Sequence, residues 1–245
     1  MPEARVSAAA IPASRHASEV PGRPFWVSVE GINGVGKTSA VHATAASLGS
    51  RCLRLDELTD QAADTLSGRV IAALAASGDV FLRTGHPVVE TLALLALKFR
   101  EAERLDSERL DGVDVIVEDR GVDSVAVYQG AILHAEHRQT PARAVAEQVL
   151  ATARRWRPMP DATILLTGDR EVCTARFAAR IGRSLAARDL EVIAQADQLY
   201  RELAAAEPAR FTVVDVTGHG PEETGKAVEA AVRATVAHRE VDRAS

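Results

Sequence analysis

The chain has few of the features that mark secreted, membrane or nucleic-acid-binding proteins. Its two cysteines, Cys52 and Cys173, lie far apart in apolar segments and form neither a disulfide framework nor a metal-binding spacing. No apolar run reaches the length of a membrane-spanning helix, and the longest, VVETLALLALKF, contains Glu90 and Lys98. The net charge of −5 provides no general attraction for nucleic acid, so an anion-binding site would have to be built locally.

The two ends of the chain differ in composition from its middle. Residues 1–23 mix Ala, Pro, Ser and charged residues without the continuous apolar centre of a signal peptide, and we expect a disordered tail there. Residues 239–245 predict a frayed C-terminal tail. No internal repeat is visible, and 245 residues fit one α/β domain, which we expect over 24–238. Because the two cysteines form no disulfide framework, we expect the protein to lie in the reducing cytoplasm.

Short apolar runs alternate with helix-forming stretches rich in Ala, Leu, Arg and Glu. The runs are FWVSVE, RCLRLD, VDVIVED, DATILLT and RFTVVDVT. Near-continuous apolar strands of this kind are typical of parallel sheets that are covered on both faces. The pattern predicts a three-layer α/β fold with a five-stranded parallel sheet flanked by helices. Ligands bind beyond the carboxyl ends of such strands, so the residues that follow each run form the candidate site.

The first of these exits, EGINGVGKTS, has the spacing of a phosphate-binding loop. Gly31, Gly36, Lys37 and Thr38 occupy the defined places of the pattern G-x-x-x-x-G-K-S/T, between a predicted strand and a predicted helix. Glycines let backbone N–H groups curve around an anion, and the helix N-terminus adds partial positive charge. The alternative is a glycine turn before a helix, with a solvated lysine. The strand and helix on either side favour nucleotide binding.

A second exit, VIVEDRG, places charged residues directly after an apolar strand. Glu118, Asp119 and Arg120 put carboxylates and a guanidinium at the mouth of the same crevice. Mg²⁺ prefers oxygen ligands, and Asp119 together with Thr38 suits that ion. The fork of Arg120 is able to grip phosphate oxygens. An ordinary surface salt bridge is the alternative interpretation.

Five arginines lie along a third region, REVCTARFAARIGRSLAARDL. They are Arg170, Arg176, Arg180, Arg183 and Arg188. Gly182 offers a bend between two predicted helices, and we expect a small helical lid at about 176–190. The first two arginines are expected to form the solvated face of a helix. The three that flank the glycine, Arg180, Arg183 and Arg188, are expected to close over a triphosphate and neutralise its charge.

These segments together resemble the thymidylate kinase family of P-loop nucleoside monophosphate kinases. VEGINGVGKTS is similar to the family loop F-E-G-x-D-G-x-G-K-T-T, and EDRGVDSVAVYQG to its segment D-R-Y-x-x-S-x-x-A-Y-Q-G. PDATILLTGDREVCTARFAAR and ARDLEVIAQADQLYREL resemble the segments on either side of the family's lid. The resemblance implies a P-loop kinase fold that transfers the γ-phosphoryl group of ATP, with Mg²⁺, to a pyrimidine deoxynucleoside monophosphate.

The resemblance also implies a role for each matching position. The residues implied to hold ATP phosphates are Gly31, Asn33, Gly34, Val35, Gly36, Lys37, Thr38 and Ser39. Those implied to lie beside the acceptor are Ser124, Tyr128 and Gln129. Thr38 and Asp119 would hold magnesium, and Arg120 would contact phosphate. Because Gly34 leaves the loop without an arginine, a lid arginine would supply the charge for the transition state.

The sequence departs from the family pattern on the acceptor side. Asn33 stands where the family loop has Asp, and Asp56 lies near the place of an acceptor-phosphate arginine. In the segment that matches L-L-F-A-A-D-R, Leu94 replaces the ring-stacking Phe and Lys98 replaces the Arg. Lys98 is then the best-placed cation for an acceptor phosphate, and Asp56 and Leu94 are expected to lie beside the acceptor.

Two further functions stay open beside a nucleoside monophosphate kinase. Asp56 or Glu57 would serve as a general base if the acceptor were a deoxynucleoside or another hydroxyl-bearing small molecule, although both carboxylates also suit the first turn of a helix. A non-catalytic nucleotide-binding regulator would be expected to lack the loop lysine, the strand-end Asp or the lid arginines, and all are present.

We therefore predict a phosphotransferase that uses ATP and Mg²⁺. Its catalytic groups are predicted to be Lys37, Arg120, Arg180, Arg183 and Arg188, with Glu57 as the base in the hydroxyl alternative. A nucleotide or nucleoside is the expected partner, with no nucleic acid and no membrane, and a homodimer is left open.

Overall fold

The computed structural model describes residues 23–105 and 110–244. Of the predicted N-terminal tail, residues 1–22 lie outside the described residues, whereas Arg23 bonds to Asp161 at 2.6 Å. The strands are β1 (Phe25–Glu30), β2 (Cys52–Leu55), β3 (Val115–Asp119), β4 (Ala162–Thr167) and β5 (Phe211–Asp215). The α-helices are α1 (Lys37–Leu48), α2 (Leu66–Ala75), α3 (Pro87–Glu103), α4 (Val122–Glu136), α5 (Ala142–Trp156), α6 (Arg170–Ile181), α7 (Ala187–Ala206) and α8 (Pro221–Ala244).

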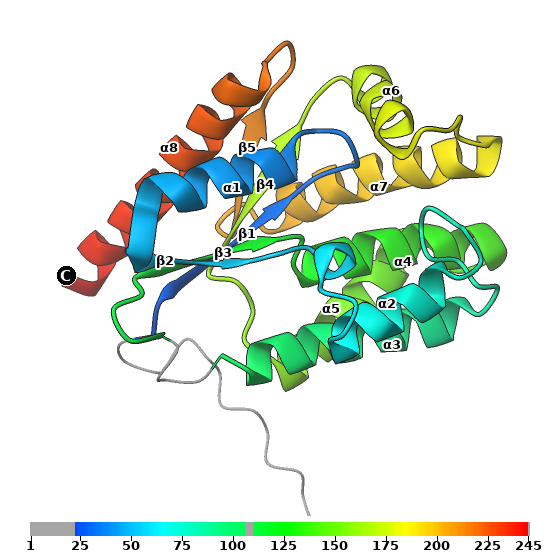
Figure 1. The fold of residues 1–245 in the computed structure, drawn as a ribbon, viewed down its shortest axis with the longest axis horizontal. Helices are drawn as coiled ribbons and strands as arrows, with labels where there is room; N and C mark the ends of the chain where they lie inside the picture. The colour runs from blue at the N-terminus through cyan, green and yellow to red at the C-terminus, as the bar shows by residue number, and fades with distance from the viewer. Residues whose placement is uncertain (1–22, 106–109, 245) are drawn as a thin grey trace, which may run out of the picture.

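The predicted parallel sheet is confirmed. Its strand order is β2-β3-β1-β4-β5, and every neighbouring pair is parallel (Figure 1). β1 and β4 are buried along their whole length, which explains why their sequences are apolar without alternation. β5 forms an edge of the sheet, and Val213 on this strand is 54% exposed.

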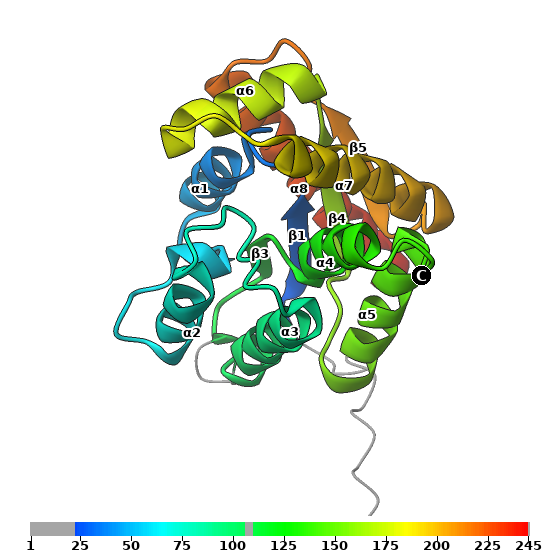
Figure 2. The same ribbon diagram turned by 90° about the vertical axis from the view of Figure 1, so that its right-hand side faces the viewer.

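Helices cover both faces of the sheet, as the three-layer prediction requires. α1 and α8 pack together on one face, and α4 packs with α3, α5 and α7 on the other (Figures 1 and 2). The main core between these layers includes the fully buried Val27, Val29 and Ile164. α8 continues to Ala244, so the frayed tail predicted for 239–245 is replaced by helix over its described part.

The lid region is small. Asp169 caps α6 by accepting hydrogen bonds from the backbone N–H groups of Glu171 (2.8 Å) and Val172 (3.1 Å). α6 ends at Gly182, whose φ of +67° is the left-handed conformation that favours glycine. α7 begins five residues later at Ala187. The predicted bend at Gly182 is therefore present. In the described part of the chain, every helix is too short or too polar to cross a membrane.

Candidate active site

The loop between β1 and α1 needs glycine at two positions because the backbone is crowded. A Cβ on Gly34 would lie 2.0 Å from the carbonyl oxygen of Cys173 in α6, and one on Gly31 would lie 2.5 Å from that of Leu166 in β4. Gly36 precedes α1 with a φ of +104°. Beneath the loop, Val35 is buried. The loop is thus held in a curved shape against α6, which lies beside it in Figures 1 and 2.

Lys37 is buried in the first turn of α1. Its Nζ donates a hydrogen bond to the backbone carbonyl of Ile32 at 2.8 Å, which folds the side chain back over the loop. Burial, together with the neighbouring Arg120 guanidinium, lowers the pKa of Lys37 to about 7. An anion placed in the loop would oppose both effects and favour the charged ammonium.

A cavity opens over this loop. It is lined by Gly34, Gly36, Lys37, Thr38, Ser39, Glu57, Arg120, Arg176 and Arg180. We call it the donor cavity. Its walls bring the glycine loop, the residues after β2 and β3, and the last turns of α6 around one space. Four cationic side chains, together with the N-terminus of α1, suit it to a polyphosphate.

The arginines of the lid region divide between two places. Arg180 lines the donor cavity, and Arg176, for which we expected only a solvated role, lines it too. Arg183 and Arg188 line a different cavity, between the loop after α2 and the start of α7. There Arg188 lies 3.6 Å from Asp79. One turn of α6 separates Arg176 from Arg180, which puts both on the face toward the glycine loop.

Asp119 at the end of β3 has the character of a magnesium ligand. Both of its carboxylate oxygens are buried and have no hydrogen-bond partner, an arrangement that is costly unless a cation is bound there. Thr38 supplies a hydroxyl to the neighbouring cavity. Among the described residues no group of three or more His, Cys, Asp or Glu forms a metal cage. Residues Asp119 and Thr38 therefore fit an ion whose remaining ligands are nucleotide oxygens and water.

Arg120 lies at the centre of the site in a strained backbone conformation. Its φ of +61° is rare for a residue other than glycine, and such strain is characteristic of functional positions. The guanidinium pairs with Glu57 (Nε to Oε1, 2.9 Å), donates to Asn33 Oδ1 at 3.1 Å, and lies over the ring of Tyr128. Asn33 also accepts a hydrogen bond from the Tyr128 hydroxyl. The left-handed turn thus aims Arg120 back toward the glycine loop.

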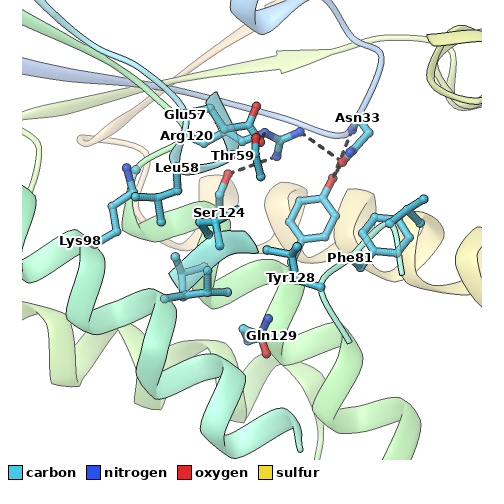
Figure 3. A pocket seen from close by; sticks show the side chains of 16 residues that line it. Asn33, Glu57, Leu58, Thr59, Phe81, Lys98, Arg120, Ser124, Tyr128 and Gln129 are labelled. Atoms are coloured by element: carbon cyan, nitrogen blue, oxygen red, sulfur yellow. Dashed lines mark hydrogen bonds and ion pairs between the residues drawn. The ribbon is translucent and has the colours of Figure 1, made fainter. Parts of the chain in front are cut away.

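A second cavity lies on the other side of Arg120 (Figure 3). We call it the acceptor cavity. It is lined by Asn33, Glu57, Leu58, Thr59, Ile71, Val80, Phe81, Leu82, Leu94, Lys98, Arg120, Gly121, Ser124, Val125, Tyr128 and Gln129. A mainly apolar lining with a few polar groups is typical of small-molecule sites. The expected acceptor residues Leu94, Ser124, Tyr128 and Gln129 all lie here. Asn33, which was expected at the ATP phosphates, lines this cavity and not the donor cavity.

The two carboxylates after β2 point to different places. Glu57 lines both cavities, and although burial alone would raise its pKa, Arg120 and Lys37 lower that pKa below its ordinary value. Asp56 lies outside both and pairs with Arg54 (2.7 Å) and with His42 (3.6 Å). The structure therefore does not bring Asp56 to the acceptor cavity, although it is the chain neighbour of Glu57.

Lys98 reaches the acceptor cavity from α3, but its charge is already paired. Its Nζ lies 2.9 Å from Glu118 and 2.9 Å from Glu101. Burial would lower the pKa of Lys98, yet these two carboxylates raise it. Glu118 is fully buried and also accepts a hydrogen bond from Trp26. Removing Lys98 would therefore leave a buried carboxylate without its main partner.

Two residues at or beside the site, Phe81 and Glu30, were not among the predicted site residues. Phe81 lines the acceptor cavity from a loop in which we identified no signal. Glu30, the last residue of β1, accepts hydrogen bonds from Ser124 (2.5 Å), Tyr200 (3.0 Å) and the backbone N–H of Gly121 (2.7 Å). Burial and the neighbouring Asp123 raise the pKa of Glu30 to about 7. A carboxylate that ends an apolar strand beside the glycine loop was the available signal for Glu30.

The fold and the paired cavities define a P-loop phosphotransferase. A sequence model of thymidylate kinase matches residues 29–228. The chain is 29% identical to the thymidylate kinase of Methylococcus capsulatus, with 78% of this chain and 86% of that protein covered. It is 29% identical to a probable thymidylate kinase of Halobacterium salinarum, with 84% and 94% covered. The chain belongs to the thymidylate kinase family.

Solved structures agree on the fold. The thymidylate kinase of Candida albicans superposes with a TM-score of 0.65 at 16% sequence identity, over 87% of this chain and 92% of that one. That of Ehrlichia chaffeensis gives a TM-score of 0.59 at 17% identity, over 86% and 99%. These likenesses show the P-loop kinase fold. Membership of the thymidylate kinase family shows that the protein is a phosphotransferase whose reaction is phosphoryl transfer between nucleotides.

Proposed function

We propose that this protein transfers the γ-phosphoryl group of ATP, with Mg²⁺, to a nucleoside monophosphate, dTMP or a close analogue, in the cytoplasm. The observation that carries the proposal is the position of Arg120, which lines both cavities and lies between them. A phosphoryl group that moves from one bound nucleotide to another must cross this boundary. Arg120 is then available to both the leaving and the accepting phosphate oxygens.

On the donor side, the chain's own groups bind and orient the ATP phosphates. Lys37 and the N–H groups of the loop hold the β- and γ-phosphates, and Arg176 and Arg180 approach from α6 to neutralise charge as it moves. Thr38 and Asp119 would hold Mg²⁺, and the ion would supply positive charge that stabilises the phosphate oxygens. Catalysis by positioning and charge stabilisation needs no covalent intermediate on the protein.

On the acceptor side, we assign the phosphate contact to Arg120 rather than to Lys98. The ammonium of Lys98 is paired with two carboxylates, whereas Arg120 pairs with the single carboxylate of Glu57. An acceptor phosphate would compete with Glu57 for the Arg120 guanidinium, because both are anions that seek the same donors. Leu94 and the aromatic side chains would enclose the rest of the acceptor.

The position of Glu57 favours a second candidate function. This carboxylate lines both cavities, and its lowered pKa keeps it ionised at neutral pH. A carboxylate at the junction suits a general base that takes a proton from an acceptor hydroxyl while the oxygen attacks the γ-phosphate. In this second candidate, the acceptor is a deoxynucleoside or another hydroxyl-bearing small molecule.

One experiment separates the two candidates. Wild-type protein and the Glu57→Gln variant are assayed for ATP consumption with dTMP, other nucleoside monophosphates and the corresponding nucleosides. If the acceptor is a monophosphate, Glu57→Gln frees Arg120 and should lower the acceptor KM by about 3-fold to 10-fold, with kcat retained. Asp56→Asn, a neighbouring carboxylate outside both cavities, is the matched control and should change neither parameter.

The opposite result would establish the hydroxyl acceptor. Turnover with nucleosides but not with monophosphates, together with a kcat of the Glu57→Gln variant that falls by about 100-fold or more, would replace the first proposal with the second. Absence of ATP consumption with every acceptor of the panel would contradict both.

A further inference from the structure

We propose that Phe81 is the aromatic wall on which the planar ring of the acceptor stacks, and that Arg83 fixes this wall to the start of α7. The inference deepens the proposed function, because it requires an acceptor that carries a ring, with or without a phosphate. It also answers a question raised by the sequence. The position that matches the family's ring-stacking Phe is Leu94, which has no ring.

The place of Phe81 in the acceptor cavity suits ring stacking. Its side chain is 8% exposed and lines the cavity opposite Lys98, as Figure 3 shows. Its ring is stacked beside that of Tyr128, with the centroids 5.7 Å apart and the planes inclined by 26°. Of the described residues that line this cavity, only Phe81 and Tyr128 are aromatic. The Tyr128 hydroxyl is bonded to Asn33, which leaves Phe81 as the wholly apolar ring.

The loop that carries Phe81 is held in an unusual shape. Asp79 accepts hydrogen bonds from the backbone N–H of Phe81 at 2.9 Å and from the Nε of Arg83 at 2.9 Å. Between them, Leu82 has a φ of +59°, a left-handed conformation that is uncommon for a residue other than glycine. Such strain persists only where the surroundings impose it, and it is found preferentially at ligand-contacting positions.

Arg83 carries this restraint to the other side of the site. Its Nη2 bonds to Asp79 at 2.8 Å and also to Asp189 in the first turn of α7. Asp189 in turn accepts a hydrogen bond from the backbone N–H of Ala186 at 2.9 Å, so that one carboxylate caps α7 and binds Arg83. The loop of Phe81 and the segment between α6 and α7 are therefore joined by one partly buried ion-pair cluster.

A second contact ties the same wall to the donor side. The ring of Phe177 in α6 lies 6.0 Å from that of Phe81, and the backbone of Phe177 lies against Gly34 of the glycine loop. Arg176, which lines the donor cavity, is the neighbour of Phe177 in the chain. An acceptor ring stacked on Phe81 would therefore be supported by α6, the helix whose Arg176 lines the donor cavity. The proposal places Phe81 as a specificity-determining residue, with Arg83 as a positioning residue.

The test is equilibrium binding to the full chain without ATP. The probes are dTMP, thymidine and 2-deoxyribose 5-phosphate, which lacks the ring. Phe81→Leu should weaken the tighter of dTMP and thymidine by about 10-fold and leave 2-deoxyribose 5-phosphate within about 2-fold. Phe81→Tyr keeps the ring and should stay within about 3-fold of wild type. Phe177→Leu removes a ring that lies behind Phe81 without removing one from the cavity wall, and it should weaken the ring-bearing probe less than Phe81→Leu does.

Each outcome decides the proposal. The stacking proposal would be overturned if Phe81→Leu weakened ring-bearing and ring-free probes equally, or weakened neither. In that case, binding of dTMP or thymidine by the wild type would still support the proposed function. Wild-type protein that binds neither dTMP nor thymidine would overturn both. If Phe81→Leu does not fold, Arg83→Gln replaces it, and should weaken the ring-bearing probe by about 3-fold to 10-fold and not the ring-free one. Unchanged binding by a folded Arg83→Gln variant would refute the positioning role.

Discussion

The donor and acceptor sides of this site hold their positive charges differently. Among the described residues, no carboxylate forms an ion pair with Lys37, Arg176 or Arg180 on the donor side. On the acceptor side, Lys98 is paired with Glu118 and Glu101. Arg120, which lies between the two sides, is paired with Glu57.

This difference indicates what each cavity is built to receive. Unpaired cations around a curved loop lower the cost of bringing a polyanion out of water, so the donor cavity suits a triphosphate. In the acceptor cavity the charges are balanced before any ligand enters, so apolar contact and ring stacking contribute more of the affinity there. Breaking a donor contact should therefore reduce catalysis strongly, whereas most acceptor changes should alter affinity.

The largest effect is expected for Lys37→Ala. The variant should fold, because its side chain contacts a loop carbonyl rather than the core, and should lose about 100-fold to 1,000-fold in kcat, because no other group replaces an ammonium at the β- and γ-phosphates. Steady-state ATP consumption with the best acceptor measures this. Lys226→Ala, an exposed lysine paired with Glu222, is the control. Wild-type turnover in the folded Lys37→Ala variant would contradict the donor assignment.

Arg176→Ala and Arg180→Ala come next. Each should lower kcat by about 10-fold to 100-fold with a smaller change in the KM for ATP, since an arginine on moving charge acts mainly in the transition state. Single-turnover and steady-state rates separate the two parameters. Arg183→Ala and Arg188→Ala, in the other cavity, serve as controls and should change kcat less than about 2-fold. A larger loss in these controls would restore the broader lid predicted from the sequence.

Asp119→Asn should raise the Mg²⁺ concentration required for half-maximal activity by about 10-fold. A neutral amide is a poorer ligand for a hard cation, and the buried oxygens of Asp119 have no protein partner to lose. A magnesium titration of activity at saturating ATP checks the expectation. Should activity fall while the titration midpoint stays unchanged, Asp119 has a role other than holding the metal.

The contrast between the donor and acceptor sides also explains which parts of the site could be predicted from the sequence. The five predicted strands are confirmed. The glycine loop, Lys37, Asp119 and Arg120 could be predicted as site residues because each lies within a short segment whose spacing reflects local geometry. The acceptor cavity joins the exit of β2 to α3, α4 and the loop at 77–86, and no local pattern encodes such a junction. That is why Phe81 was missed.

The direction of individual side chains was the second feature that could not be predicted from the sequence. Asp56 and Glu57 are adjacent in the chain, and only the three-dimensional course of the backbone after β2 shows which one enters the site. Arg176 was judged solvated because its face of α6 could not be matched to the glycine loop without the packing at Gly34. The pairing of Lys98 with Glu118 likewise depends on the approach of α3 to β3.

The smallest expected effect is on stability and concerns Glu30, a carboxylate beneath the acceptor cavity. Its pKa of about 7 in the folded protein exceeds the ordinary value of 4.5, because it is buried near Asp123. The folded state therefore binds more protons than the unfolded state between pH 4.5 and 7, so this contribution to stability is present at low pH and lost as pH rises through 7. Glu30→Gln cannot ionise and should lack this contribution.

Urea denaturation of wild type and Glu30→Gln at pH 4.5 to 7 provides the measurement. The free energy of unfolding of the wild type should fall relative to the variant by about 1–3 kcal/mol across this window. Lys37, whose lowered pKa is also about 7, affects stability above pH 7, and Glu118, with a pKa lowered to about 2, acts below pH 4.5, so neither interferes. Glu147→Gln, an exposed carboxylate paired with Arg143, is the control. Parallel pH profiles for wild type and Glu30→Gln would show that Glu30 is ionised throughout this pH range. The acceptor side would then, like the donor side, hold an unpaired charge that a ligand has to balance.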